Sequence, residues 1–188
     1  FDSDVYWLDQ IVIWAGFLNS TYLCGTMDGL PVFPFIYGMM MEDDGTSCAA
    51  GYFGFGDFEP PDVDEARSVL DMAMTNMIAS GCGALIIDVR INEGGWDEIG
   101  LMVASYLVEE PTHVFSKRAF FRNTTDGTVT YSETNDVFVD PAGLYFDGPV
   151  VVLSSESTAG AGEVFVLAVK DIPSVTVMGQ RTFGLLTD

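Results

Sequence analysis

Apolar and polar positions recur with two different periods along the chain, and the changes of period predict alternating helices and strands. Between residues 62 and 78 apolar side chains return every three to four positions, which predicts an amphipathic helix. Asp62 can cap this helix, and Glu65 three residues later gives a capping-box pattern. The expected apolar face consists of Val63, Ala66, Leu70, Ala73, Met77 and Ile78. The continuous apolar run ALIIDVR at 84–90 predicts a strand buried on both faces.

The rest of the pattern predicts one α/β domain. In chain order we expect a helix within 1–25, an extended segment at 30–41, a strand at 49–58, a helix at 97–108, hairpin strands at 114–121 and 128–139, a strand at 150–153, a helix at 161–171 and a strand at 174–178. Strands that alternate with helices pair in parallel. We therefore predict a mostly parallel sheet with flanking helices and a β-hairpin, with residues 1–48 as an approach segment and 49–188 as the core domain.

Charge narrows the possible partners. The 188 residues hold 28 Asp and Glu against 7 Lys and Arg, a formal net charge of −21. Nucleic acid and anionic membranes require basic patches, so we exclude both as partners. We also expect no membrane span, because no apolar run approaches about 20 residues. The only lysines, Lys117 and Lys170, fit either a salt-adapted surface or an acidic mesophilic protein.

The cysteines and the start of the chain carry little information about function. Cys24, Cys48 and Cys82 are too few and too scattered for a disulfide framework or a zinc site. We predict neither a metal nor a cofactor. The chain begins at Phe1 without a basic, signal-like region, so no signal peptide is visible.

Two predicted strand-to-helix turns are candidates for chemistry. One follows the 84–90 strand as Asn92-Glu93-Gly94-Gly95, and the other joins the 150–153 strand to the helix at Ala161. A helix N-terminus carries partial positive charge, and glycine lets a ligand oxygen approach the backbone closely. Two such turns side by side would form an oxyanion hole for acyl transfer, although each is also an ordinary connection in an α/β fold.

These segments together resemble the carboxyl-terminal processing, or tail-specific, serine peptidases, a family that includes the tricorn core and retinoid-binding-protein repeats. Members show a strand ending in D-x-R-x-N-x-G-G, then T-A-S-A-x-E, then P-x5-G-x-x-T-x-G. The matching residues are Asp88, Arg90, Asn92, Gly94, Gly95, Thr158, Ala159, Gly160, Ala161, Gly162, Glu163, Pro173, Gly179, Thr182 and Gly184. The segment GYFGFGDF at 51–58 resembles a further family strand. The resemblance covers about residues 49–188.

The resemblance implies a fold related to Clp peptidase and crotonase and a serine nucleophile at the third position of T-A-S-A. It also implies an oxyanion hole formed by the N–H of Ala161 and one from Gly94-Gly95. The nucleophile position is Gly160, which has no side chain to attack a carbonyl. The processing branch places its lysine base where this chain has Leu185, and the one histidine, His113, lies between the two motifs.

Three other polar residues lie near these motifs. Ser157 is a candidate rescue nucleophile, but a hydroxyl three residues before Gly160 also suits a turn or helix cap. Asp171 matches an acidic family position and equally suits a solvated helix end. We expect Glu163, in the first helical turn, to interact favourably with the helix dipole.

Two functions follow from the resemblance. The first is a serine peptidase that acts near protein C-termini, in a chain that is inactive because of Gly160. The second is a non-catalytic peptide- or lipophile-binding protein, for which aromatic residues at 33–37 and 52–58 would either line an apolar groove or form the core. The resemblance favours a periplasmic or secreted location and implies a further strand after Asp188. The sequence does not decide the oligomeric state.

Overall fold

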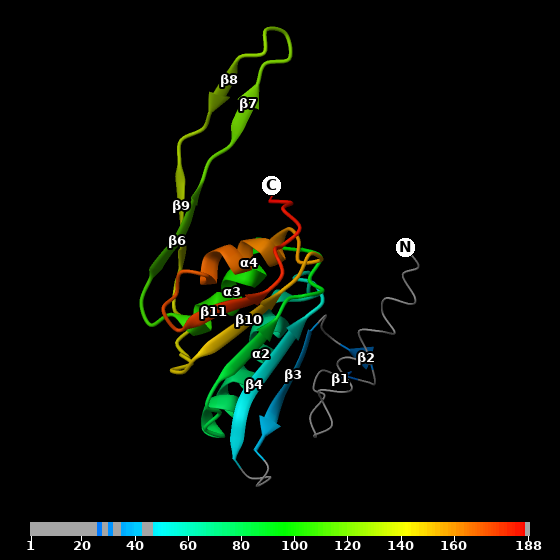
Figure 1. The fold of residues 1–188 in the computed structure, drawn as a ribbon, viewed down its shortest axis with the longest axis vertical. Helices are drawn as coiled ribbons and strands as arrows, with labels where there is room; N and C mark the ends of the chain where they lie inside the picture. Colours follow the sequence, from blue (N-terminus) through cyan, green and yellow to red (C-terminus); the bar gives the residue numbers. More distant parts are fainter. Residues whose placement is uncertain (1–25, 28–29, 32–34, 43–46, 187–188) are drawn as a thin grey trace.

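The computed structural model describes residues 26–27, 30–31, 35–42 and 47–186. Its centre is a five-stranded sheet in the order β11-β10-β5-β4-β3 (Figure 1). These strands are β3 (Phe35–Met41), β4 (Cys48–Phe55), β5 (Leu85–Asp88), β10 (Val150–Ser154) and β11 (Val175–Gly179). β3 pairs antiparallel with β4, and the other neighbours pair in parallel. The mostly parallel α/β sheet expected from the sequence is confirmed.

Three helices and several short elements complete the described fold. The helices are α2 (Val63–Ala79), α3 (Asp97–Ala104) and α4 (Ala161–Val169), and α3 continues into a 3₁₀ turn at Ser105–Leu107. A small pair, β1 (Thr26–Met27) and β2 (Leu30–Pro31), precedes the sheet. α3 packs against α4, whereas α2 contacts β3 and β4. Within the described ranges no helix has the length and apolar character needed to cross a membrane. The helix expected within 1–25 lies outside the described residues.

The α2 helix begins as predicted. Asp62 accepts a hydrogen bond from the Glu65 N–H at 2.9 Å, so the cap is present. The predicted apolar face is wrong at its end, because Ile78 is exposed and Met74 is buried instead. Ile78 follows Met77 by about 100° around the helix axis, which turns it away from the buried stripe.

The aromatic side chains of residues 52–58 lie in the core. Phe53, Phe55 and Phe58 are each at most 1% exposed, and their rings form a chain of contacts that ends at Phe165 of α4. These residues therefore form part of the hydrophobic core and do not line an apolar groove. Their burial also fixes α4 against the sheet, which positions the start of that helix.

The predicted hairpin forms a long arm, defined here as residues 112–139. Its inner part pairs β6 (Thr112–Lys117) with β9 (Asn135–Val139), and its outer part pairs β7 (Phe120–Arg122) with β8 (Val129–Tyr131). Asp126-Gly127 lies at the tip, as the sequence predicts. In Figure 1 the arm extends well away from the sheet and helices.

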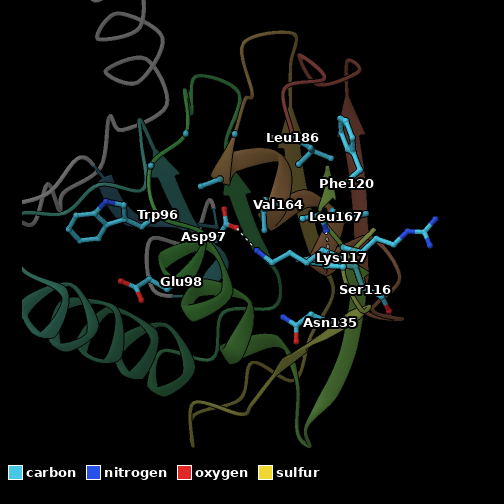
Figure 2. A pocket seen from close by; sticks show the side chains of 18 of the residues that line it. Trp96, Asp97, Glu98, Ser116, Lys117, Phe120, Asn135, Val164, Leu167 and Leu186 are labelled. Carbon is cyan, nitrogen blue, oxygen red and sulfur yellow. Dashed lines mark hydrogen bonds and ion pairs between the residues drawn. The ribbon is translucent and has the colours of Figure 1, made fainter. Parts of the chain in front are cut away.

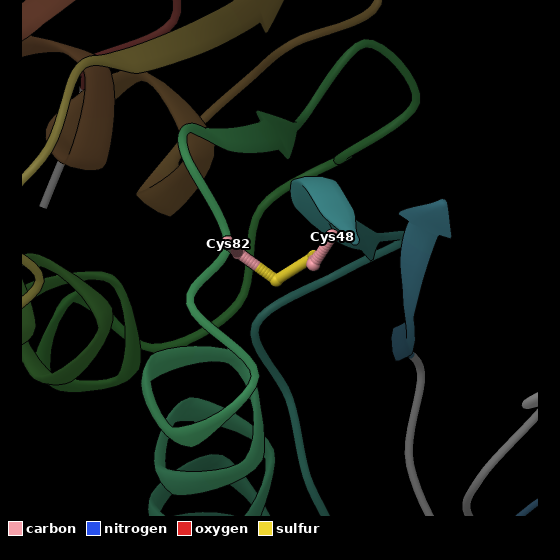
Figure 3. The surroundings of a disulfide bond; sticks show 2 residues. All are labelled: Cys48 and Cys82. Carbon is pink, nitrogen blue, oxygen red and sulfur yellow. A yellow bond between two sulfur atoms is a disulfide. The ribbon is translucent and has the colours of Figure 1, made fainter. Parts of the chain in front are cut away.

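A disulfide joins Cys48 to Cys82 (Figure 3). Cys48 begins β4, and Cys82 lies in the connection between α2 and β5. The sequence excludes a disulfide framework of several bonds, and it does not predict this single bond. The pairing arises from tertiary structure: β4 and β5 are adjacent, the Gly83 N–H donates to the Cys48 carbonyl, and the two Cα atoms lie 4.5 Å apart despite 34 residues of separation.

Reduction of this disulfide is expected to lower the free energy of unfolding by about 2–4 kcal/mol, because the bond restricts the unfolded chain. Urea unfolding with and without reductant measures the difference. Cys48→Ser with Cys82→Ser should abolish the effect of reductant, whereas Cys24→Ser should preserve it. Equal midpoints with and without reductant would contradict the prediction.

Candidate active site

The two glycine-containing turns meet at one edge of the sheet. β5 and β10 are parallel neighbours, so their carboxyl ends lie together, with Asp88 opposite Leu153. Hydrogen bonds then join the segments that follow: the Ala159 N–H donates to the Asn92 carbonyl at 2.9 Å, and the Thr158 hydroxyl donates to the Val89 carbonyl at 2.7 Å. These bonds hold the start of α4 against the turn that follows β5.

Asn92 organises the first turn from inside. Its side chain is fully buried, and Oδ1 accepts the Gly94 N–H at 3.1 Å. Gly162 permits this arrangement, because a Cβ there would lie 2.6 Å from Asn92 Oδ1. The Asn92 Nδ2 group is buried and has no hydrogen-bond partner among the described residues. Asn92 is thus a structural link between the two turns.

Gly160 occupies the sharp turn into α4. It is the N-cap residue, with φ 50° and ψ −122°, a conformation that costs an L-residue energy. A Cβ at this position would lie 3.4 Å from Gly94 Cα, which is an ordinary contact. A side chain therefore has room here, but it would be strained. Nucleophiles at strand-to-helix turns in other hydrolases occupy strained positions of this kind.

Two backbone N–H groups remain for a ligand beside Gly160. Neither the Gly95 N–H nor the Ala161 N–H donates a hydrogen bond to any described residue. A Cβ at Gly94 would lie 3.8 Å from the Ala161 nitrogen, so the two turns are in close contact. Ala161 is the first residue of α4, where the helix dipole adds positive potential. This arrangement suits a carbonyl oxygen or an oxyanion.

Glu163 anchors the segment that follows β11. Its buried carboxylate accepts the Gly184 N–H at 2.7 Å and the Leu185 N–H at 2.6 Å. Burial alone would raise the pKa of Glu163, but hydrogen bonds from Thr182, Gly184 and Leu185 outweigh it and lower the pKa below its usual 4.5. The sequence reading of Glu163 as a dipole partner missed this contact. No local sequence signal predicts this contact, because residues 184 and 185 follow Glu163 by 21 and 22 positions.

Glu163→Gln is expected to lower the free energy of unfolding by about 1–3 kcal/mol at pH 7, because a charged acceptor of two backbone N–H groups is lost. The folded pKa is lowered, so the wild-type advantage is complete above the usual 4.5 and is lost as pH falls through the folded value. Denaturant unfolding of both proteins from pH 7 to pH 3 measures this. A difference that stays constant or grows as pH falls would contradict the assignment.

A polar cluster around the buried carboxylate of Asp88 supports the end of β5. The Tyr52 hydroxyl donates to Asp88 at 2.9 Å, and Arg90 donates to both carboxylate oxygens of Asp88, at 2.9 and 2.6 Å. Burial, followed by the Asp88 charge, raises the pKa of Tyr52. The hydroxyl of Ser155 donates to the Arg90 carbonyl, so the cluster is tied to the turn after β10. Sequence reasoning identified Asp88 and Arg90 as motif residues but missed Tyr52.

A cleft of about 1430 Å³ opens beside the two turns (Figure 2). Gly95, Gly160 and Ala161 line one part, and the inner arm forms another wall. Lys117 reaches from the arm to Asp97 of α3, with Nζ and Oδ2 3.8 Å apart. An extended chain therefore has room to pass the two unpaired N–H groups. No group of three or more His, Cys, Asp and Glu side chains in the described part of the chain could hold a metal ion.

The other candidate residues lie at different places. Ser157 is in the turn before Gly160, where its N–H donates to the Ser155 hydroxyl at 3.0 Å. Asp171 is 80% exposed and pairs with Lys170 at 3.2 Å, as a solvated helix end would. His113 is exposed on the arm and contacts Ser116. The structure thus brings together Gly94, Gly95, Gly160 and Ala161, but not Asp171 or His113.

The chain is similar to known peptidases in sequence and in fold. The profile of peptidase family S41 matches residues 49–187. A carboxyl-terminal-processing protease of Synechocystis is 26% identical over 144 residues, covering 77% of this chain and 30% of the relative. A Parabacteroides merdae structure provisionally described as a peptidase has a TM-score of 0.72 and 25% identity, covering 93% and 49% of the two chains. The structure of the photosystem II D1 C-terminal processing protease has a TM-score of 0.58 and 24% sequence identity, and the match covers 81% of this chain and 37% of that chain.

Proposed function

Because the chain belongs to peptidase family S41, we propose that its two turns bind a peptide carbonyl near the C-terminus of a polypeptide, and that Gly160 leaves this chain unable to cleave it. The chain spans about a third of the length of the processing protease of Synechocystis, so activity and substrate belong to this proposal. The observation that carries it is the pair of N–H groups at Gly95 and Ala161, both without a described acceptor beside Gly160.

The missing step is nucleophilic attack. Acyl transfer needs a nucleophile that is activated by a neighbouring base. Gly160 supplies no attacking atom, and position 185 carries the apolar side chain of leucine, which is 48% exposed. The sequence offers Ser157 as a substitute nucleophile. It does not offer a general base that would activate Ser157. Binding without turnover is therefore the behaviour that this chain supports best.

The second candidate function is a dedicated binding protein for peptides or lipophiles on the same scaffold, rather than a peptidase that has lost its nucleophile. The cleft beside the turns favours it, because Val164 and Leu167 of α4 line that cleft together with both turns. Apolar side chains beside backbone donors suit an extended peptide. A lipophile is less well supported, because the β4 aromatics considered for it lie in the core.

The disulfide favours an oxidising compartment for this domain. Cys48 and Cys82 form a bond that cytosolic reductants would normally remove. This supports the periplasmic or secreted location that the family resemblance implies.

Peptide binding and cleavage should be measured on the same sample. Calorimetry with peptides that have free C-terminal carboxylates is expected to show binding, and mass spectrometry of the mixture is expected to show intact peptide. Matched peptides that are amidated at the C-terminus test whether the terminus is recognised. Cleavage by the unmodified chain would contradict the inactive assignment, and the absence of binding to all peptides would contradict the binding function.

A further inference from the structure

The outer arm exposes apolar side chains on both strands of an isolated two-stranded ribbon. All six residues of β7 and β8 are exposed, namely Phe120, Phe121, Arg122, Val129, Thr130 and Tyr131. They form a separate two-stranded sheet that extends from the body in Figure 1. A two-stranded ribbon is marginally stable in water unless a further surface covers it. The outer arm therefore has the character of a contact surface.

The two faces of this ribbon differ. Phe120 is opposite Tyr131 and Arg122 is opposite Val129, so these four side chains share one face, called here the Tyr131 face. Phe121 and Thr130 share the other face. Phe120, Tyr131 and Val129 are 65%, 58% and 40% exposed. The Tyr131 face thus carries most of the exposed apolar surface and is the better candidate for an interface.

The charge of the arm differs from that of the whole chain. Residues 112–139 hold three Lys and Arg and three Asp and Glu, whereas the chain has a net charge of −21. Two arms can therefore approach without net repulsion. Arms that overlap from opposite directions would also keep the acidic bodies apart, beyond the roughly 8 Å over which charges interact strongly at physiological salt.

Charges of both signs are present at each end of the arm. Lys117, Arg118, Glu133 and Asp136 lie toward the base, whereas Arg122 and Asp126 lie near the tip. Antiparallel packing brings the base of one arm toward the tip of the other, so no excess of like charge opposes it. A membrane fits less well, because the tip that would enter first, residues 123–128, is polar.

We propose that two copies of this chain form a symmetric dimer in which their arms pack antiparallel through the Tyr131 face. A two-fold interface uses the same patch on both copies, which the neutral, apolar ribbon satisfies. Each ribbon then covers the exposed rings of the other. The partner is a second copy of this chain, and of the four residues of the Tyr131 face only Phe120 also lines the cleft beside the two glycine turns.

Sedimentation velocity across a concentration series tests this proposal on the whole chain. Tyr131→Ser with Val129→Ser is expected to raise the dimer dissociation constant at least tenfold. Phe121→Ser is the matched control, because Phe121 is 60% exposed on the same ribbon but on the opposite face. Arg122→Glu is a second variant on the Tyr131 face, and it keeps the apolar residues of the ribbon in place. Circular dichroism confirms that each variant remains folded.

Each result supports or overturns the dimer. Loss of association in the Tyr131-face variants, with retention in Phe121→Ser, supports it, as does an elongated dimer in small-angle X-ray scattering. A monomer at every concentration overturns it. Equal association of all variants, equal loss in the control, or a monomer that binds anionic phosphatidylglycerol vesicles through the arm also overturns it.

Discussion

Gly160→Ser combined with Leu185→Lys is expected to give this chain measurable peptidase activity. A Cβ at position 160 meets Gly94 Cα at 3.4 Å, so the serine side chain has room beside the unpaired N–H groups of Gly95 and Ala161. The backbone at 185 is held by Glu163, at 2.6 Å, which fixes the segment that carries the new lysine. General bases contribute about 10²–10⁴-fold, so we expect at least a hundredfold gain over either single variant.

Peptide hydrolysis and fluorophosphonate labelling measure this gain in the full-length polypeptide. The single variants are the matched controls: Gly160→Ser lacks the base, and Leu185→Lys lacks the nucleophile. The serine also introduces backbone strain of about 1–3 kcal/mol at a positive φ, so stability should fall as activity appears. A folded double variant that neither hydrolyses peptide nor reacts with the fluorophosphonate would contradict the assignment of these positions.

Gly95→Ala is expected to lower the free energy of unfolding by more than about 3 kcal/mol, through strain and overpacking together. Gly95 has φ 117°, and a Cβ there would lie 2.4 Å from the carbonyl carbon of Phe58, which is backbone and cannot turn aside. The Phe58 N–H and carbonyl also hydrogen-bond to the Gly94 carbonyl and the Trp96 N–H. The substitution therefore displaces the turn that presents the Gly95 N–H, and peptide binding should weaken with stability.

Gly127→Ala separates local crowding from the general effect of losing a glycine. Gly127 also has a positive φ, of 76°, but nothing lies within 4 Å of an added Cβ at the arm tip. Its substitution should lower the free energy of unfolding by only about 1–2 kcal/mol, through local backbone strain, and should leave peptide binding intact. Chemical denaturation of both variants makes the comparison. If both variants lost the same stability, contact with Phe58 would not be the cause of the loss in Gly95→Ala.

The sequence predicts the sheet and the main helices because their signals are local. The Asp62 cap, the apolar run at 84–90 and the Asp126-Gly127 turn each depend on a few neighbouring residues, and all three appear in the structure. The disulfide depends instead on how β4 and β5 pair, and the spacing of Cys48 and Cys82 carries no record of that pairing.

The candidate site is also only partly predictable from the sequence. The family motifs identify Gly94, Gly95, Gly160 and Ala161 without the structure. The contact of Glu163 with residues 184–185 arises when β11 returns beside β10, so no local pattern predicts it. Tyr52 is missed for the same reason, because its partner Asp88 is 36 residues away on the next strand.

We infer that the carbonyl-binding site is intact although the nucleophile is absent. The most direct test is a titration of the ¹⁵N-labelled chain with a C-terminal peptide, followed through the amide resonances of Gly95 and Ala161. We expect both resonances to shift together as the site fills, while the peptide stays uncleaved. Peptide binding that leaves these two amides unchanged would contradict it.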